Sequence, residues 1–256
     1  MTKPRNYQTE AIITKKTKLG EADRILTLYT PYMGKIQGIA KGVRRPRSKL
    51  SGHLELLTHS QISLARGRGI DTIIGSQALN SFLELKSDLD LTSQALYTTE
   101  LVNQFTAEHI ENHPLFELLL KTLEMLCEGG DNELVLHYFE LNLLERVGYR
   151  PQLERCVSCR LPLKPVTNSF CPSAGGMLCL SCTRSQSLAY PVSVNGLTVL
   201  RLLQDGDYNT AGKLRMDSEL SHELERIMRN YLRYLLEREI KSTVWLDTLR
   251  QQSKQT

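Results

Sequence analysis

The stretch TEAIITKKTKLGEADRILTLYTPYMGKIQGIAKG, residues 9–42, specifies the architecture of the first third of the chain. Its apolar and β-branched residues form three short runs, and turn sequences containing glycine and proline separate them, as in strands joined by tight turns. The runs are Thr9–Lys16, Arg24–Thr30 and Lys35–Lys41. The pattern continues with Leu56–Arg66 and Ile70–Leu79, on either side of Gly67-Arg68-Gly69. We therefore predict five short strands.

Five short strands within about 80 residues suit a small β-barrel. Among barrels of this size, the five-stranded OB-fold binds oligonucleotides across one face and its loops. We expect an OB-fold nucleic-acid-binding domain over residues 1–80.

A cluster of cations lies between the third and fourth predicted strands. The segment KGVRRPRSK, residues 41–49, is called the basic loop, and it contains no acidic residue. Its basic residues are Lys41, Arg44, Arg45, Arg47 and Lys49. Such runs are often solvated loops, and some are targeting signals. The alternative is a surface that contacts a polyanion.

Charge is unevenly divided along the chain. Residues 1–80 hold 14 Lys and Arg against 5 Asp and Glu, whereas the remaining residues hold 18 against 23. A basic region joined to an acidic one indicates a polyanionic partner for the basic region, and nucleic acid is the commonest such partner. This favours nucleic-acid binding as the role of the basic loop.

The composition is that of a globular protein. The 256 residues, 41% of them hydrophobic, suit one large domain or two to three small ones. The N-terminus has no apolar signal-peptide core, and no run approaches the ~18 apolar residues of a membrane span. We expect a soluble, cytoplasmic protein with no membrane partner.

The period of the apolar residues changes near residue 80 from strand-like to helical. Helical spacing predicts helices over 96–105, 114–126, 132–147 and from Asp217 or Ser218 to about Ile240. We therefore expect an all-α C-terminal domain in two parts, residues 81–152 and 187–256, interrupted by a cysteine-rich insert over residues 153–186.

The insert contains the strongest local motif of the chain. Cys156-x2-Cys159 is followed after nineteen residues by Cys179-x2-Cys182. Two such pairs at this separation are typical of a tetrahedral zinc site, so we predict a four-cysteine zinc finger. Four thiolates leave no open coordination position, which favours structural over catalytic Zn²⁺. A redox dithiol is less favoured, because neither pair opens a helix after a strand in a βαβ setting.

Two further cysteines are expected to have other roles. Cys171 lies in the insert, but its spacing to Cys179 is poor for a ligand pair, so we expect a spare thiol near the site. Cys127 falls on the apolar side of a predicted helix and is expected to be buried. Gly175-Gly176 is expected to form the tight turn before the second pair.

The sequence contains no recognisable catalytic constellation. His109 and His113 flank Glu111, but a zinc metalloprotease motif requires the acid directly after the first histidine. The acidic residues of the first third do not cluster as a two-metal nuclease would require. We therefore predict that the protein is not an enzyme.

Five motifs, in a specific order, carry a resemblance to a known family. They are YQTEAII at residues 7–13, GEADR at 20–24, AKGVRRPRS at 40–48, ERVGYRP at 145–151 and AGG at 174–176. Over nearly its whole length the chain resembles the RecO family of bacterial recombination mediators, which act in DNA repair. The family more often has alanine at the position of Val43.

The resemblance implies a fold and a function. It implies an OB-fold, a helical C-terminal domain and a zinc element. Members bind single- and double-stranded DNA, anneal complementary strands without nucleotide hydrolysis, and act with RecR to help RecA replace the single-strand binding protein, whose acidic C-terminal tail they recognise. A cytoplasmic, nucleoid-associated location follows. The implied phosphate contacts are Lys41, Arg44, Arg45, Arg47 and Lys49, with Lys35 on the adjoining strand as a sixth.

Two other functions stay open from the residues. A basic OB-fold with a zinc knuckle also suits RNA or a ribosome-associated factor. The second alternative is a zinc-dependent nuclease or deaminase acting on DNA, against which four-cysteine ligation argues.

Overall fold

The computed structural model describes residues 4–45, 48, 50–184, 186, 188–206, 214 and 216–243. Its contacts divide the chain into two compact units, Met1–Glu128 with Ser242–Thr256, and Gly129–Lys241. Among the described residues, no helix combines the length and the apolar character that a membrane crossing requires.

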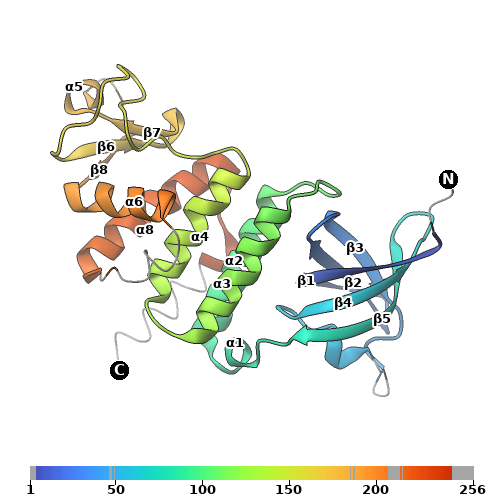
Figure 1. The fold of residues 1–256 in the computed structure, drawn as a ribbon. Coiled ribbons are helices and arrows are strands. Elements are labelled where there is room, and N and C mark those ends of the chain that lie inside the picture. Colours follow the sequence, from blue (N-terminus) through green and yellow to red (C-terminus); the bar gives the residue numbers. More distant parts are fainter. Residues whose placement is uncertain are drawn as a thin grey trace. The chain divides into compact units, whose positions relative to one another are not determined.

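Five strands of the first unit close into a barrel in the order β1-β2-β3-β5-β4 (Figure 1). The strands are β1 (Asn6–Leu19), β2 (Asp23–Thr30), β3 (Gly34–Ala40), β4 (His59–Ala65) and β5 (Asp71–Asn80). β1 is long enough to pair with β4 through its first half and with β2 through its second half. β3 and β5 pair in parallel and close the barrel. The predicted OB-fold barrel is confirmed.

Alternate residues of the strands point into the barrel and form its core, as the period of two requires. The core includes Ala11, Ile13, Leu26, Leu28, Ile36, Ile62, Leu64 and Ile73. The predicted start of the fourth strand at Leu56 was wrong. A short 3-10 helix, η1 (Ser51–His53), and a left-handed Leu57 (φ 62°) precede β4, and that backbone conformation is incompatible with a strand.

Three helices of the first unit follow β5: α1 (Leu83–Ser87), α2 (Leu89–Phe105) and α3 (His113–Glu128). The Asp88 side chain caps α2 by accepting a hydrogen bond from the Leu91 amide. α2 packs against β1, and α3 packs against α2 and β2. Cys127, expected to be buried, is half-buried at the end of α3. The division of the chain at residues 80, 152 and 186 stays a prediction.

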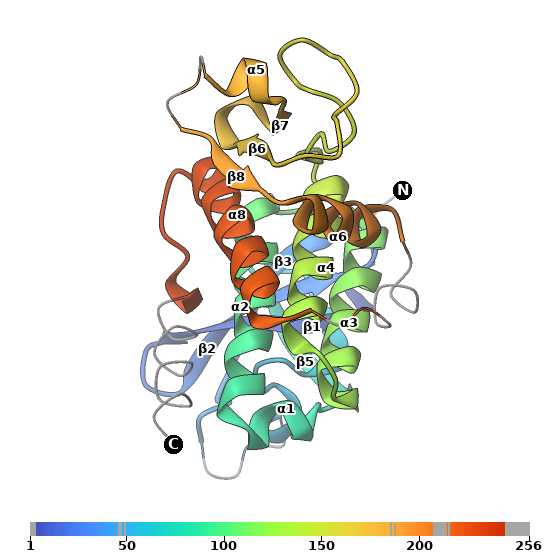
Figure 2. The same ribbon diagram turned by 90° about the vertical axis from the view of Figure 1, so that its left-hand side faces the viewer.

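Three long helices of the second unit pack against one another (Figure 2). They are α4 (Asn132–Arg146), α6 (Val194–Asp205) and α8 (Ser218–Leu236). The apolar stripe predicted for the last helix is a packing face, with Leu224, Ile227, Met228 and Tyr231 buried. Its extension to Ile240 was wrong, because Glu237 has a left-handed backbone (φ 52°) that ends the helix.

A small three-stranded sheet interrupts these helices, and most of it lies in residues 153–190, called the cysteine element. β6 (Asn168–Cys171) lies between β7 (Gly176–Leu178) and β8 (Tyr190–Val192), and the short helix α5 (Leu180–Thr183) follows β7. Gly175, at φ 66°, forms the turn before β7, as expected for the Gly175-Gly176 pair. These strands were not predicted, because strands of three or four residues are too short to show a period.

Candidate nucleic-acid interface and metal site

The basic loop leaves β3 at Lys41 and is held to the barrel by its own backbone. The Gly42 amide donates to Asp23 Oδ1 at 2.7 Å, and the Arg44 amide donates to the Ala22 carbonyl at 3.0 Å. Gly42 has a left-handed backbone (φ 63°), a conformation that glycine adopts without strain. Between these bonds, Val43 is buried at 7% exposure in the barrel core. Val43 is thus the anchor of the loop, a role that the sequence pattern did not reveal.

The cations around this anchor point to solvent. Lys41, Arg44 and Arg45 are exposed. The Arg44 guanidinium also lies 3.4 Å from the Gly20 carbonyl, to which it donates, and this contact keeps it beside the β1–β2 turn. Arg47 and Lys49 lie outside the described residues. The structure therefore gathers three of the five loop cations on a short loop tied to the barrel.

Lys35 is separate from this group. Its ammonium donates to the carbonyls of Asn103, at 2.7 Å, and Thr106, at the C-terminal end of α2. A cation at this position satisfies carbonyls that lack helical partners and complements the helix dipole. Because its ammonium already has two protein acceptors, we do not retain Lys35 as a sixth phosphate contact.

The first 80 residues contain three tyrosines that could stack on bases. Tyr29 is fully buried, and burial raises its pKa. Tyr7 donates a 2.6 Å hydrogen bond to Asp71 and lies 4.7 Å from the Arg66 guanidinium. Tyr32 differs from both, because its side chain is 66% exposed. One open ring leaves charge as the main means of holding a polynucleotide at the barrel.

The four predicted ligand cysteines come together in the second unit. The sulfur atoms of Cys156, Cys159, Cys179 and Cys182 all lie within 4.8 Å of one another. Cys159 Sγ and Cys179 Sγ are 3.9 Å apart, close to the ~3.8 Å between sulfurs of a tetrahedral ion with 2.3 Å bonds. The first pair lies on a turn closed by the Arg160 amide, which donates to the Cys156 carbonyl at 2.8 Å. The donor set fits a tetrahedral metal ion.

Thiols this close cannot all ionise without a cation. Burial raises the pKa of Cys156, but hydrogen bonds from the amides of Cys159, Cys179 and Ser158 lower it to about 6. The Ser158 hydroxyl lowers the pKa of Cys182, but hydrogen bonds with the neighbouring thiols raise it to about 11. A divalent ion bound by all four sulfurs would stabilise all four as thiolates.

Cys171 does not belong to the sulfur cluster. It is fully buried, and its Sγ lies 3.3 Å from Ser173 Oγ. It packs with Cys156 and Leu178 in a small core beside the cluster. The expectation of a spare thiol near the site is confirmed.

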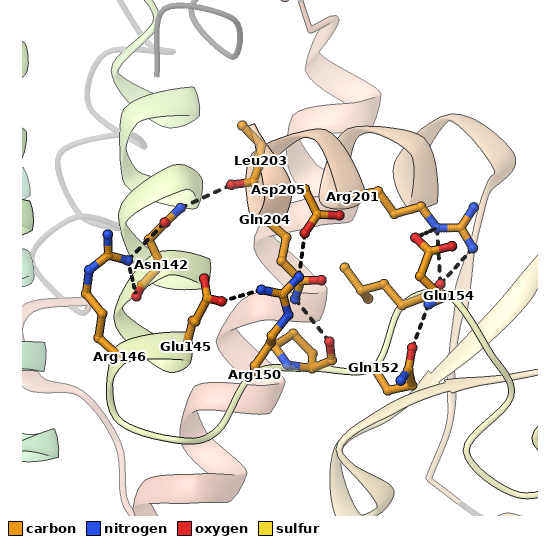
Figure 3. Close-up of polar contacts among 12 residues, drawn as sticks. Asn142, Glu145, Arg146, Arg150, Gln152, Glu154, Arg201, Leu203, Gln204 and Asp205 are labelled. Atoms are coloured by element: carbon orange, nitrogen blue, oxygen red, sulfur yellow. Dashed lines mark hydrogen bonds and ion pairs between the residues drawn. The ribbon is translucent and has the colours of Figure 1, made fainter. Parts of the chain in front are cut away.

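A polar network lies where the cysteine element meets the helices of its own unit (Figure 3). Arg150, just before the element, bridges Glu145 of α4 and Asp205 of α6. Arg201 of α6 pairs with Glu154 at 2.9 Å. These contacts were missed by the sequence reasoning, because their partners are far apart in the chain and no local spacing marks them.

Comparison with known proteins covers both units. Residues 1–82 match the family model for the recombination protein O N terminal, and residues 86–243 match that for the recombination protein O C terminal. The chain is 48% identical over 250 residues to the DNA repair protein RecO of Dehalococcoides mccartyi, covering 98% of each chain. It is 41% identical over 247 residues to the DNA repair protein RecO of a Roseiflexus species, covering 96% of this chain and 87% of the relative. With the barrel, the helical part and the cysteine cluster in place, these matches show that the chain belongs to the RecO family of DNA repair proteins.

Proposed function

We propose that this protein is a recombination mediator that binds single- and double-stranded DNA and anneals complementary strands without ATP. The observation that carries the proposal is the exposed group Lys41, Arg44 and Arg45 on a loop pinned to the OB-fold barrel. Membership of the RecO family of DNA repair proteins supports a role for this cationic surface in binding DNA.

The chemistry of annealing suits such a loop. Two polyanions must approach each other while their bases stay free to pair, and cations that neutralise phosphates allow this without reading sequence. Arg47 and Lys49 complete the proposed set of five contacts. Five contacts on single-stranded DNA correspond to a salt slope of about −3.5, so affinity should fall roughly a hundredfold between ~50 and ~200 mM salt.

The proposed ion of the sulfur cluster is Zn²⁺, held by Cys156, Cys159, Cys179 and Cys182 in a structural role. When bound, it would neutralise the thiolates and cross-link the two halves of the cysteine element. Four thiolates leave no open position for water, so we assign no hydrolytic step to the site and propose that the protein acts without catalysis.

The proposed partners follow from the family. They are RecR, the acidic C-terminal tail of the single-strand binding protein, and, indirectly, RecA, whose loading onto coated DNA the protein would assist. We propose that this takes place on nucleoid DNA in the cytoplasm. The RecO family membership and the exposed basic loop support these assignments.

Salt-dependent binding of a labelled single strand, followed by fluorescence anisotropy, tests the proposal. The double variant Arg44→Ala, Arg45→Ala loses two phosphate contacts, so the magnitude of the salt slope should fall by about 1.4. An unchanged slope in this variant would remove the loop from the DNA surface. Tighter binding of RNA than of DNA of the same sequence, at equal salt, would favour the RNA-binding alternative.

The matched control is Arg229→Ala with Arg233→Ala on α8. It removes the same formal charge from side chains that already pair with Glu225 and Glu239. We expect its salt slope to equal that of the wild type. An equal fall of slope in both variants would show that total charge, and not the loop, governs binding.

A further inference from the structure

The cysteine element concentrates positive charge within an acidic part of the chain. Residues 153–190 contain four basic residues (Lys or Arg) and one acidic residue. Residues 81–152, in contrast, contain four basic and thirteen acidic residues. The four cations are Arg155, Arg160, Lys164 and Arg184. The division into a basic first third and an acidic remainder therefore conceals a second basic segment.

All four cations are exposed, and none forms an ion pair within the part of the chain that the structure describes. The one acid of the element, Glu154, pairs with Arg201 of α6. By contrast, Arg150 and Arg229 of the same unit are each paired with a carboxylate. The cations of the cysteine element are thus available to an external anion.

The sulfur cluster gathers these cations from two distant parts of the chain. Arg155 and Arg160 adjoin the first cysteine pair, and Arg184 lies two residues beyond the second. Because the four sulfurs lie within 4.8 Å of one another, the turns that carry these arginines meet at the cluster. Arg160 has a left-handed backbone (φ 63°) within the first turn. The metal site therefore also organises a basic surface.

We propose that the cysteine element is a second nucleic-acid-binding surface, which holds a DNA strand through Arg155, Arg160 and Arg184, with Lys164 as an outer contact. This inference rests on the proposed annealing function, because annealing joins two strands and the basic loop accounts for contact with one. Arginine suits the task, since its planar guanidinium donates two parallel hydrogen bonds to a phosphate.

Exposed leucines accompany the cations. Leu161, Leu180 and Leu188 are 65%, 60% and 68% exposed. Only a contiguous group of exposed apolar side chains marks a contact surface, so these leucines are a secondary observation beside the cations. In the proposal they pack against the sugars and unstacked bases of a single strand.

The exposure of the cations favours nucleic acid over an acidic peptide. Peptide and protein recognition concentrates binding energy in a few desolvated pockets, whereas each of these four cations is exposed. Cations spread over separate turns suit a chain of regularly repeated phosphates, where affinity grows with the number of charges neutralised.

The test measures binding of a second strand by the full-length, metal-loaded protein. The protein is first saturated with a donor-labelled oligonucleotide and then titrated with an acceptor-labelled oligonucleotide that is not complementary. Energy transfer and sedimentation report complexes of one protein with two strands. The element variant combines Arg155→Gln, Arg160→Gln and Arg184→Gln. The control combines Arg229→Gln, Arg233→Gln and Arg238→Gln, which removes the same charge from the same unit.

We expect the wild type and the control to form the two-strand complex. The element variant should bind the first strand within about twofold of the wild type. It should bind the second strand at least about tenfold more weakly at low salt, because three phosphate contacts are lost, and anneal more slowly. If this variant releases its metal, a second variant that combines Lys164→Gln and Arg184→Gln provides the test, because it leaves the neighbours of the first cysteine pair unchanged. Its affinity for the second strand should fall about fivefold.

Equal second-strand binding by the element variant and the control would overturn the inference. So would a metal-loaded element that binds an acidic peptide ending in apolar residues while its substitutions leave second-strand binding unchanged. The proposed function fails separately, if the wild type does not bind the first strand at all. If the wild type anneals and the element variant does so equally well, only the second surface is wrong.

Discussion

The basic loop and the cysteine element both display exposed cations, but they hold them in different ways. The loop is fixed by Val43 in the barrel core and by the amides of Gly42 and Arg44, which donate to the Asp23 side chain and the Ala22 carbonyl. The cysteine element has a small core of its own and four clustered sulfurs beside it. A short segment without a large core needs a cross-link, whereas a loop on a closed barrel does not.

The largest difference between the two regions should appear when the sulfur cluster is broken. We expect Cys156→Ser to lose the bound metal and to unfold the cysteine element, because metal binding supplies on the order of 10 kcal/mol of folding energy in small zinc modules. The basic loop should still bind a single strand within about twofold of the wild type. Metal analysis, hydrogen exchange of residues 153–190 and anisotropy check these three points.

Cys127→Ser is the matched control for this experiment. Cys127 is a half-buried thiol on α3, outside the sulfur cluster, so its variant should keep the metal and the protection of the element. A Cys156→Ser protein that kept its full metal content would contradict the ligand assignment.

Substitutions of two lysines of the first unit should have opposite effects on stability and on DNA binding. Lys35→Met removes the cation that donates to two carbonyls at the end of α2, so the free energy of unfolding should fall by about 1.5–3 kcal/mol with DNA affinity unchanged. Lys41→Met removes an exposed cation, so stability should hold while affinity falls roughly fourfold at ~150 mM salt. Denaturant unfolding and anisotropy measure both variants, and the reverse pattern would exchange the two roles.

The smallest effect on DNA binding concerns the anchor of the loop. Val43→Ala deletes two buried methyl groups, so the free energy of unfolding should fall by about 1.5–2.5 kcal/mol. DNA affinity should stay within about twofold, because the cations remain in place. Thermal unfolding and anisotropy provide the readings. A clear loss of affinity with unchanged stability would make Val43 a contact residue instead of an anchor.

Much of the barrel could be predicted from sequence, because strand period and turn chemistry are local signals. Gly34 illustrates this: its backbone in the turn before β3 is left-handed (φ 61°), a conformation that glycine adopts without strain. The start of β4 could not be predicted in this way, because the left-handed Leu57 leaves no signal in an apolar run. The sheet of the cysteine element could not be predicted either, because its strands are too short to show an apolar period.

The candidate sites show the same difference between local signals, which the sequence reveals, and contacts between distant residues, which it does not. The sulfur cluster and the basic loop are encoded by residues close together in sequence, so spacing revealed them. The role of Lys35 depends on acceptors 68 and 71 residues away, and the Arg150–Asp205 pair spans 55 residues. Such contacts arise only from tertiary packing. The cations of the cysteine element were overlooked because they were averaged into an acidic region.

Strand annealing is the most direct test of the proposed mediator role. Complementary oligonucleotides coated with single-strand binding protein are mixed without ATP, and the wild type is compared with the triple variant Arg44→Ala, Arg45→Ala, Arg47→Ala. We expect the wild type to anneal the strands and the folded triple variant to fail. Equal annealing by both proteins would show that the basic loop is only a solvated surface, and no annealing by either would contradict the proposed function.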